Sequence, residues 1–189
     1  MRRASKDTRA HIIEVAYDCF FRQGFSRTGV DAVAEAAGVT KRTLYYHFDS
    51  KDALIAAVLG SQHRMVIERI QRWAQQTSGD PSTITDMLFE KFASWASEPK
   101  WQGSGFTRIA MELADLPGHP ARLAARRHKA ALEDWFALQL AESGRTDAGI
   151  LARRVMLLLE GCLSLVLIHG DTAYAKEAAE AARQLLLKP

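Results

Sequence analysis

The sequence predicts an all-helical protein, and three observations lead to that fold class. Apolar residues recur at helical spacing along almost every segment, and no segment shows the alternation typical of strands. Glycine and proline stand between the periodic segments, where they interrupt helices. With 48% hydrophobic and 25% charged residues, the 189-residue chain has the composition of an ordinary globular protein. It is long enough for one ample core or for a small domain joined to a larger one.

The first four helices have recognisable ends. We expect them over residues 7–23, 28–38, 41–47 and 51–76. Thr28 and Asp31 have the spacing of a capping box at the start of the second helix, and Gly38 ends it. Thr40 and Ser50 are the expected N-caps of the third and fourth helices.

Five further helices are expected between breaks that contain glycine or proline. The breaks are TSGDPS, SEPKWQGSG, LPGHP, SGRTDAG and HGD. The helices they separate should cover about residues 83–96, 106–115, 121–142, 150–169 and 172–187. The most hydrophobic stretch, residues 155–168, is too short to span a bilayer and contains Glu160, so it predicts a buried helix.

The two cysteines indicate the redox setting. Cys19 and Cys162 are isolated from each other and each lies in an apolar run. They offer no disulfide framework and no metal-binding spacing. Because the basic N-terminal residues are not followed by an apolar stretch, no targeting signal is expected either. We therefore expect a reduced, cytoplasmic protein.

The net charge is concentrated near the N-terminus. Residues 1–51 hold nine lysines and arginines against six aspartates and glutamates, whereas residues 52–189 hold sixteen of each. The whole formal excess of +3 therefore lies in the first quarter of the chain. A basic excess favours an acidic partner, with nucleic acid first and a membrane surface second. An accidental distribution would give the same count.

The stretch VAEAAGVTKRTL, residues 33–44, predicts two short helices that cross through a tight turn. Ala34 is small where the helices would touch, and Gly38 supplies the positive φ of the turn. Val39 and Leu44 return apolar side chains to the same core. This is the pattern of a helix-turn-helix, although a generic helical hairpin would show it too.

The adjoining stretch VTKRTLYYHF carries too many polar side chains for a core segment. They are Lys41, Arg42, Thr43, Tyr45, Tyr46 and His47. A solvated face would explain the cations but not the paired aromatic residues, which usually have a partner when exposed. On DNA, the cations reach phosphates or guanine edges, and the other four offer hydroxyl or ring donors. The helix start at Thr40 adds free backbone amides for a phosphate.

The span from Phe25 to Leu59 resembles the DNA-binding domain of the TetR (tetracycline repressor) family. The residues that carry the resemblance are Gly24-Phe25, Thr28, Ala34, Ala37-Gly38-Val39, Leu44-Tyr45, His47-Phe48 and Ser50-Lys51 through Leu54. The likeness covers about residues 8–60. Gly29 departs from it, because many relatives have serine or threonine there.

The resemblance implies roles for individual side chains. Phosphates would be contacted by Tyr45, His47 and Lys51, with Thr28 bracing the opposite strand. Bases would be faced by Lys41, Arg42 and Thr43, with Tyr46 on either bases or backbone. The resemblance further implies a helix-turn-helix DNA-binding domain over residues 1–51 and a helical effector-binding and dimerisation domain over 52–189.

The expected function is that of a transcriptional regulator. By resemblance it is a repressor that binds a palindromic operator as a homodimer and is released by a small-molecule effector. No nucleophile elbow, phosphate loop or metal spacing indicates an enzyme, and no cofactor is expected. Two alternatives stay open: a helical small-molecule carrier, and an activator with the same DNA-binding domain.

The C-terminal helices carry weaker indications. Bulky apolar candidates for an effector site, which plain core packing would equally explain, are Trp95, Trp101, Phe106, Met111 and Trp135. Small and apolar candidates for a dimer interface in the last two helices are Gly161, Ser164, Ala175, Ala178, Ala182 and Leu185. Packing within one chain is the alternative for that set. No metal site is expected, because the carboxylates and histidines of residues 112–128 lack metal spacing.

Overall fold

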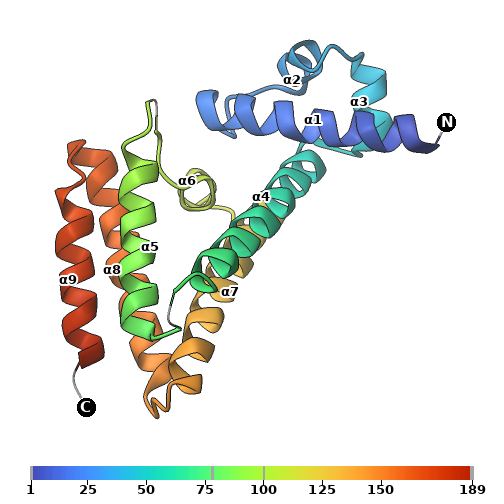
Figure 1. The fold of residues 1–189 in the computed structure, drawn as a ribbon. Coiled ribbons are helices and arrows are strands. Elements are labelled where there is room, and N and C mark those ends of the chain that lie inside the picture. The colour runs from blue at the N-terminus through green and yellow to red at the C-terminus, as the bar shows by residue number, and fades with distance from the viewer. Residues whose placement is uncertain (1, 78, 100, 188–189) are drawn as a thin grey trace. The chain divides into compact units, whose positions relative to one another are not determined.

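The computed structural model describes residues 2–77, 79–99 and 101–187, with side chains from Lys6 onward. This part of the chain forms nine α-helices and no strand, which confirms the all-helical fold (Figure 1). The helices are α1 (Arg2–Gln23), α2 (Val30–Ala36), α3 (Lys41–His47), α4 (Lys51–Ala74), α5 (Pro81–Ala96), α6 (Gly105–Glu112), α7 (Pro120–Glu142), α8 (Ala148–His169) and α9 (Ala173–Leu187). None of these helices is long and apolar enough to cross a membrane.

The helix ends differ from the prediction in a few places. Helix α1 begins at Arg2 and not at Asp7 or Thr8, because nothing in the preceding residues breaks a helix. Helix α5 begins at Pro81, with Asp80 as its N-cap. Proline is well suited to the first turn of a helix, since the amide it lacks has no partner there.

The chain packs into two compact units. The first contains residues 1–65 and 105–128, and the second contains residues 66–104 and 129–189. Helices α4 and α7 each contribute residues to both units. The predicted helix-turn-helix segment lies within the first unit, together with the start of α4, all of α6 and the start of α7.

The core of the first unit joins the N-terminal helices to α4 and α6. Its fully buried side chains include Phe20 of α1, Val33 of α2, Leu44 of α3, Leu54 of α4 and Ile109 of α6. Burying a large aliphatic or aromatic side chain contributes about 1.5–3 kcal/mol. The short helices α2 and α3 therefore owe their stability to this shared core, because seven-residue helices are marginal alone.

The turn between α2 and α3 has a specific backbone geometry. The amide of Gly38 donates to the carbonyl of Glu35, and the amide of Val39 donates to that of Ala34, both at 3.0 Å. This is the Schellman motif, which needs a left-handed residue after the helix, and Gly38 has φ +63°. A side chain at Gly38 would meet open space, so the requirement for glycine comes from the backbone angle.

The predicted capping box at the start of α2 is wrong. Gly29 is the N-cap, and no side chain caps this helix. Thr28 is 1% exposed, and its hydroxyl donates to the carbonyl of Gly24 at 2.7 Å. Because that hydroxyl is already bonded inside the α1–α2 turn, it is not free to cap the helix that follows.

The second unit is built around α5, α8 and α9. Helix α9 packs against both α5 and α8 (Figure 1). Its small residues Ala175, Ala178 and Ala182 are all buried, and Arg183 forms an ion pair of 2.9 Å with Asp86 of α5. These alanines were predicted to face a second chain, but the chain's own helices already cover them.

Asp80 offers a test of how α5 is held. Its carboxylate accepts from the amides of Ser82 and Thr83 at 3.1 and 3.2 Å, and from the Ser82 hydroxyl. These bonds, that of the Ser82 hydroxyl above all, hold the pKa of Asp80 below its usual value. Asp80→Ala should lower the free energy of unfolding by about 1 kcal/mol at pH 7, measured by urea denaturation.

The difference in the free energy of unfolding between wild type and Asp80→Ala should depend on pH. A carboxyl whose pKa is lowered in the folded state stabilises above its unfolded pKa of about 3.9, and this contribution is lost as pH falls through the folded value. The gap between wild type and Asp80→Ala should therefore shrink in acid. Asp80→Asn, which keeps an acceptor oxygen, should stay close to wild type at pH 7. An Asp80→Ala gap that is equally large in acid would contradict a role for the ionised cap.

Candidate nucleic-acid interface

Helix α3 presents most of the predicted contact residues on one exposed surface. Tyr46 is 79% exposed and Tyr45 42% exposed, and Lys41 and Arg42 are also exposed. Only Leu44 of this helix is buried. Two exposed tyrosines beside two cations on seven residues form a surface suited to phosphates and base edges. We call these four residues, Lys41, Arg42, Tyr45 and Tyr46, the α3 surface.

Thr40 fixes where this helix begins, as predicted. Its side-chain oxygen accepts from the amide of Thr43 at 3.0 Å, and the two threonine hydroxyls lie 2.8 Å apart. Both hydroxyls are therefore engaged with each other at the helix start. Such a cap contributes about 1 kcal/mol, so these threonines have a structural task in addition to any contact with a partner.

Arg42 and Lys41 differ in how they are held. Arg42 forms no ion pair or hydrogen bond within the described part of the chain, so its guanidinium is free to reach a partner. The Nζ of Lys41 lies 2.9 Å from Oδ1 and 3.0 Å from Oδ2 of Asp31 in α2. The bond to this carboxylate raises the pKa of Lys41 above its usual value. This pair was not predicted, because Asp31 was expected to be a capping residue.

Lys51 and His47 are less exposed than the residues of the α3 surface. Lys51 is half-buried at the start of α4, and its Nζ donates to the carbonyl of Ser26 at 3.0 Å. Burial lowers the pKa of Lys51. His47 is half-buried, with its ring edge against Tyr46 at a centroid distance of 5.1 Å. Thr28, predicted to brace the opposite DNA strand, is buried, and its hydroxyl is bonded to the backbone.

Helix α6 is hydrogen-bonded to α1 and to the turn between α1 and α2. The carboxylate of Glu112 accepts from the amide of Ser26 at 2.9 Å and from that of Phe25 at 3.4 Å. Arg108 donates to the carbonyl of Phe21 at 2.7 Å. These bonds tie α6 to the helices that present the α3 surface. The sequence offered no signal for them, because the partners lie 86–87 residues apart.

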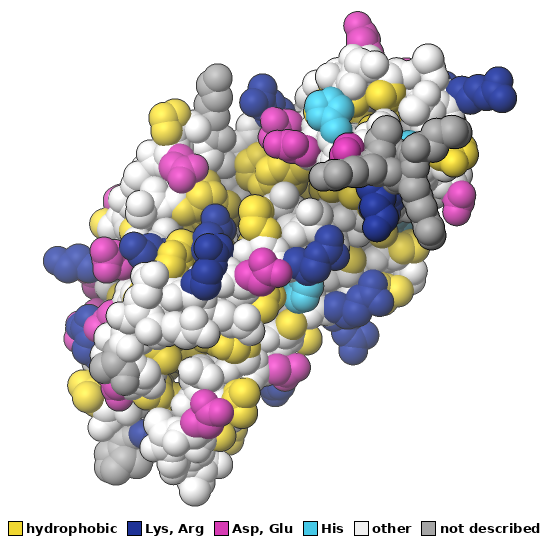
Figure 2. All heavy atoms as spheres, turned by 45° about the vertical axis from the view of Figure 1, so that its right-hand side comes forward, with side chains coloured by type: hydrophobic (Ala, Val, Ile, Leu, Met, Phe, Trp, Pro, Cys, Tyr) yellow, Lys and Arg dark blue, Asp and Glu magenta, His cyan; other side chains and the backbone are white. Residues whose placement is uncertain are grey.

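Charged side chains of both signs lie on the face of the molecule drawn in Figure 2. In the view of Figure 2, lysine and arginine side chains are spread among aspartates and glutamates and form no single basic block.

Comparison with known proteins identifies the family. A sequence model described as bacterial regulatory proteins, tetR family, matches residues 12–58. A solved structure of a TetR transcriptional regulator from Streptomyces avermitilis is 30% identical. That alignment covers 93% of this chain and 97% of the other, with a TM-score of 0.79. The chain belongs to the TetR family.

Other relatives extend over different parts of the chain. The HTH-type transcriptional regulator AcrR of Shigella flexneri is 25% identical over 173 residues, covering 86% of this chain and 78% of AcrR. TtgR of Pseudomonas putida is 44% identical over 59 residues, covering 31% of this chain and 28% of TtgR. A TetR-family regulator from Streptomyces coelicolor shares the fold with a TM-score of 0.86 at 23% identity, covering 96% of this chain and 95% of the other. The chain is thus a TetR-family transcriptional regulator with a helix-turn-helix DNA-binding segment.

The residues predicted for a TetR effector site are divided between the two units. In the second unit, Trp95 and Trp101 meet edge to face at a centroid distance of 5.5 Å, and Phe92 packs against both. In the first unit, Phe106 is buried and stacked on His128 at 3.7 Å, whereas Met111 is 65% exposed. Phe106 therefore serves as core, and the tryptophan cluster is the stronger candidate.

Trp101 has a feature that core packing does not explain. Its indole N–H is buried, and no acceptor lies within hydrogen-bond distance in the described part of the chain. A buried donor without a partner is costly, and such groups call for a specific explanation. The fifth predicted residue, Trp135, is half-buried and packs against Phe136 instead.

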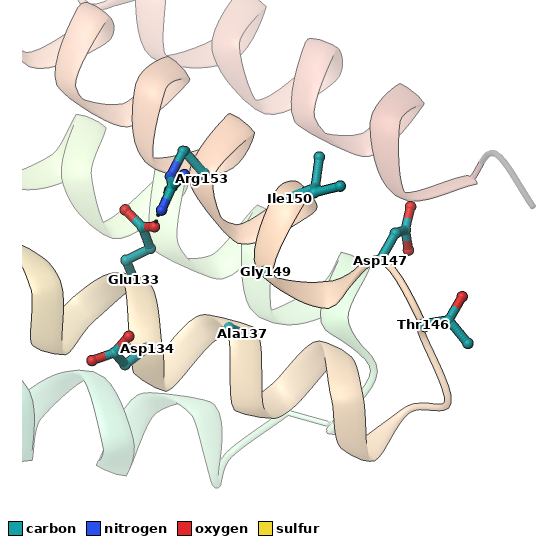
Figure 3. Close-up of a pocket in the computed structure, with 8 residues that line it drawn as sticks. All are labelled: Glu133, Asp134, Ala137, Thr146, Asp147, Gly149, Ile150 and Arg153. Atoms are coloured by element: carbon teal, nitrogen blue, oxygen red, sulfur yellow. Dashed lines mark hydrogen bonds and ion pairs between the residues drawn. The ribbon is translucent and has the colours of Figure 1, made fainter.

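A separate open cleft lies between the end of α7 and the start of α8. It has a volume of about 370 Å³, and Figure 3 shows Glu133 and Arg153 facing each other across it, 3.0 Å apart. Its lining also includes Asp134, Asp147 and Ile150. None of the predicted effector residues lines this cleft, and five of its eight lining residues are polar or charged, whereas small-molecule sites are lined mainly by apolar and aromatic residues.

Helix α8 carries an exposed apolar stripe. Ile150, Leu157 and Ile168 are 58%, 68% and 71% exposed, and the predicted Gly161 and Ser164 lie between them. The positions are separated by seven, four, three and four residues, the spacing of a helix–helix seam. We call this set, Ile150, Leu157, Gly161, Ser164 and Ile168, the α8 stripe. Leu185 of α9, also predicted for the interface, is half-buried against the core of the second unit.

The cysteines and the candidate metal ligands are also placed. Burial raises the pKa of Cys162 to about 11, and burial together with Asp18 raises that of Cys19. Both thiols are therefore mostly protonated, and unreactive, at neutral pH. In the described part of the chain, no three histidine, cysteine or carboxylate side chains come together as metal ligands.

Proposed function

We propose that this TetR-family regulator is a repressor that binds a palindromic operator as a homodimer and is released by a small-molecule effector. The observation that carries the proposal is the α3 surface. An exposed arginine and two exposed tyrosines stand on a helix whose start and preceding turn are fixed by the Thr40 cap and the Schellman motif. In the helix-turn-helix geometry, the second helix of the motif, which is α3 in this chain, enters the major groove.

The α8 stripe supports the homodimer. A monomer has little use for three aliphatic side chains that are each more than half exposed on one helix face. Pairing two copies about a two-fold axis would cover both stripes with the same contact. The two α3 surfaces would then meet half-sites about 34–36 Å apart, which is one turn of DNA.

The tryptophan cluster supports an apolar or aromatic effector that carries a hydrogen-bond acceptor. Trp95 and Trp101 supply ring faces and edges, and the buried N–H of Trp101 lacks an acceptor of its own. A ligand oxygen or nitrogen at that N–H would replace an unsatisfied donor with a bond. Ring surface with a few placed polar groups is the usual composition of such sites.

Helix α4 offers the route from effector to DNA. It contributes residues to both units, and its first residue, Lys51, is bonded to the α1–α2 turn. An effector that tilts α4 would change the separation of the two α3 surfaces. To release DNA it must bind the released form more tightly, and a coupling of about 1–3 kcal/mol would be ordinary.

A reporter experiment tests this proposal. The duplex that the protein selects from random DNA is placed in a promoter, and expression is measured with and without the protein. A repressor lowers expression, and compounds that quench the fluorescence of the tryptophan cluster should restore expression. Raised expression would identify an activator instead. Unchanged expression with retained binding of apolar compounds would identify a carrier. Since its partner would be chromosomal DNA, the proposed location is the cytoplasm.

A further inference from the structure

The ion pair between α2 and α3 joins a carboxylate to a lysine on the α3 surface. Both oxygens of Asp31 lie within 3.0 Å of Lys41 Nζ. The two side chains are 72% and 54% exposed. The pair therefore stands at the surface that would meet DNA, and not inside the fold.

Stability is a weak explanation for this pair. Ion pairs between exposed side chains contribute about 0–1 kcal/mol, and salt screens them further. The helix start is already held by Thr40, and the turn by the Schellman bonds. A carboxylate at a DNA-facing position is also repelled by phosphates on every sequence. Asp31 thus adds little to folding and opposes general binding to DNA.

We propose that Asp31 is a positioning residue that sets sequence specificity through Lys41. The Asp31 carboxylate offsets the charge of Lys41 and so weakens the attraction of this lysine to phosphates. It also keeps the ammonium group of Lys41 in a fixed position, within hydrogen-bond distance of the carboxylate. The pair then favours one G·C base pair in each half-site, where guanine O6 and N7 accept from Lys41. This inference rests on the proposed role of the α3 surface in reading DNA.

The pairing has a measurable consequence for salt dependence. A lysine that contacts a phosphate releases counterions whatever the sequence, and each such contact steepens the salt slope by about 0.9. A lysine bonded to Asp31 contributes little to this sequence-independent salt dependence. Removing the carboxylate should free Lys41 to bind phosphates. Affinity for all sequences would rise, while the preference for the operator would fall.

The test compares Asp31→Asn with Glu35→Gln in the full-length protein. Both substitutions remove one negative charge from the exposed side of α2, but Glu35 forms no ion pair in the described part of the chain. Dissociation constants are measured for the selected operator and for a random-sequence duplex over a range of salt. We expect Asp31→Asn to steepen the random-duplex slope by about one per protomer. We expect its operator preference to fall roughly 5- to 150-fold for each half-site, mainly at one G·C pair.

A second background shows whether Asp31 acts through Lys41. In a Lys41→Gln protein, adding Asp31→Asn should leave the operator preference and the salt slope unchanged beyond the effect of Glu35→Gln. If Asp31→Asn matches Glu35→Gln in the otherwise wild-type chain, or still lowers the preference without Lys41, the inference is overturned. If the wild-type protein itself prefers no duplex, the proposed function fails, and the inference fails with it.

Discussion

Arg42→Ala should weaken operator binding by roughly 1–3 kcal/mol for each half-site, and should relax the preference at one or two base pairs. Arg42 is exposed on α3 and has no bonding partner in the described part of the chain, so its guanidinium can bond two acceptors of a guanine edge. On a palindrome both half-sites lose this contact, giving a total of about 2–6 kcal/mol. The measurement is a set of dissociation constants over single-base variants of the selected operator.

Two comparison variants separate the recognition of bases from the sequence-independent attraction to DNA. Tyr45→Phe removes only the phenolic hydroxyl and should weaken all sequences about equally, as expected for a phosphate contact. Arg126→Ala removes an exposed cation from α7 in the same unit and should have a much smaller effect. Should Arg42→Ala weaken every sequence by the same factor, Arg42 would belong with the phosphate contacts, and another residue would have to read the bases.

Leu157→Glu should convert the protein to folded monomers. Leu157 lies in the middle of the α8 stripe and is 68% exposed in the single chain, so the substitution leaves the core intact. Each buried leucine contributes about 1.5–3 kcal/mol, and a two-fold interface loses two of them, or roughly 3–6 kcal/mol. The dissociation constant of the dimer should rise about 10²- to 10⁴-fold, measured by sedimentation over a range of concentrations. Operator affinity should fall with it, because two half-sites are no longer bound by one molecule.

Controls for this variant come from two other positions. Gln75→Glu adds the same charge at an exposed position just after α4 and should leave the dimer unchanged. Ala178→Leu overfills the contact that α9 makes inside its own chain, and should cost about 1–3 kcal/mol of folding stability. A Leu157→Glu protein that sediments like wild type would show that another surface joins the chains.

The fold could be predicted from the sequence because its signals are local. Helical spacing, glycine stops and the Thr40 cap each act over a few residues, and all appear where expected. The capping box at Thr28 was wrong because a short motif does not show whether its hydroxyl is already bonded to Gly24. The alanines of α9 indicated close packing but not the partner, and α5 lies about ninety residues earlier in the chain.

The candidate site was predicted less completely, again for a physical reason. Residue types on α3 indicated a contact surface, since polar and aromatic side chains crowd seven residues. Which of them are already engaged depends on distance in space. The pair of Asp31 with Lys41 and the bonds of Glu112 to the α1–α2 turn join separate helices. For the effector site, large aromatic residues indicate burial, and Phe106 showed that burial can mean core packing instead.

The central claim, that the α3 surfaces of a homodimer read DNA, is tested most directly by selecting bound duplexes from a random DNA pool at several salt concentrations. We expect enrichment of one palindromic sequence whose half-site centres lie about 34–36 Å apart. We also expect its preference over random DNA to persist as salt weakens both. Weak binding of all sequences, with no enrichment and a steep loss in salt, would contradict base reading by the α3 surface.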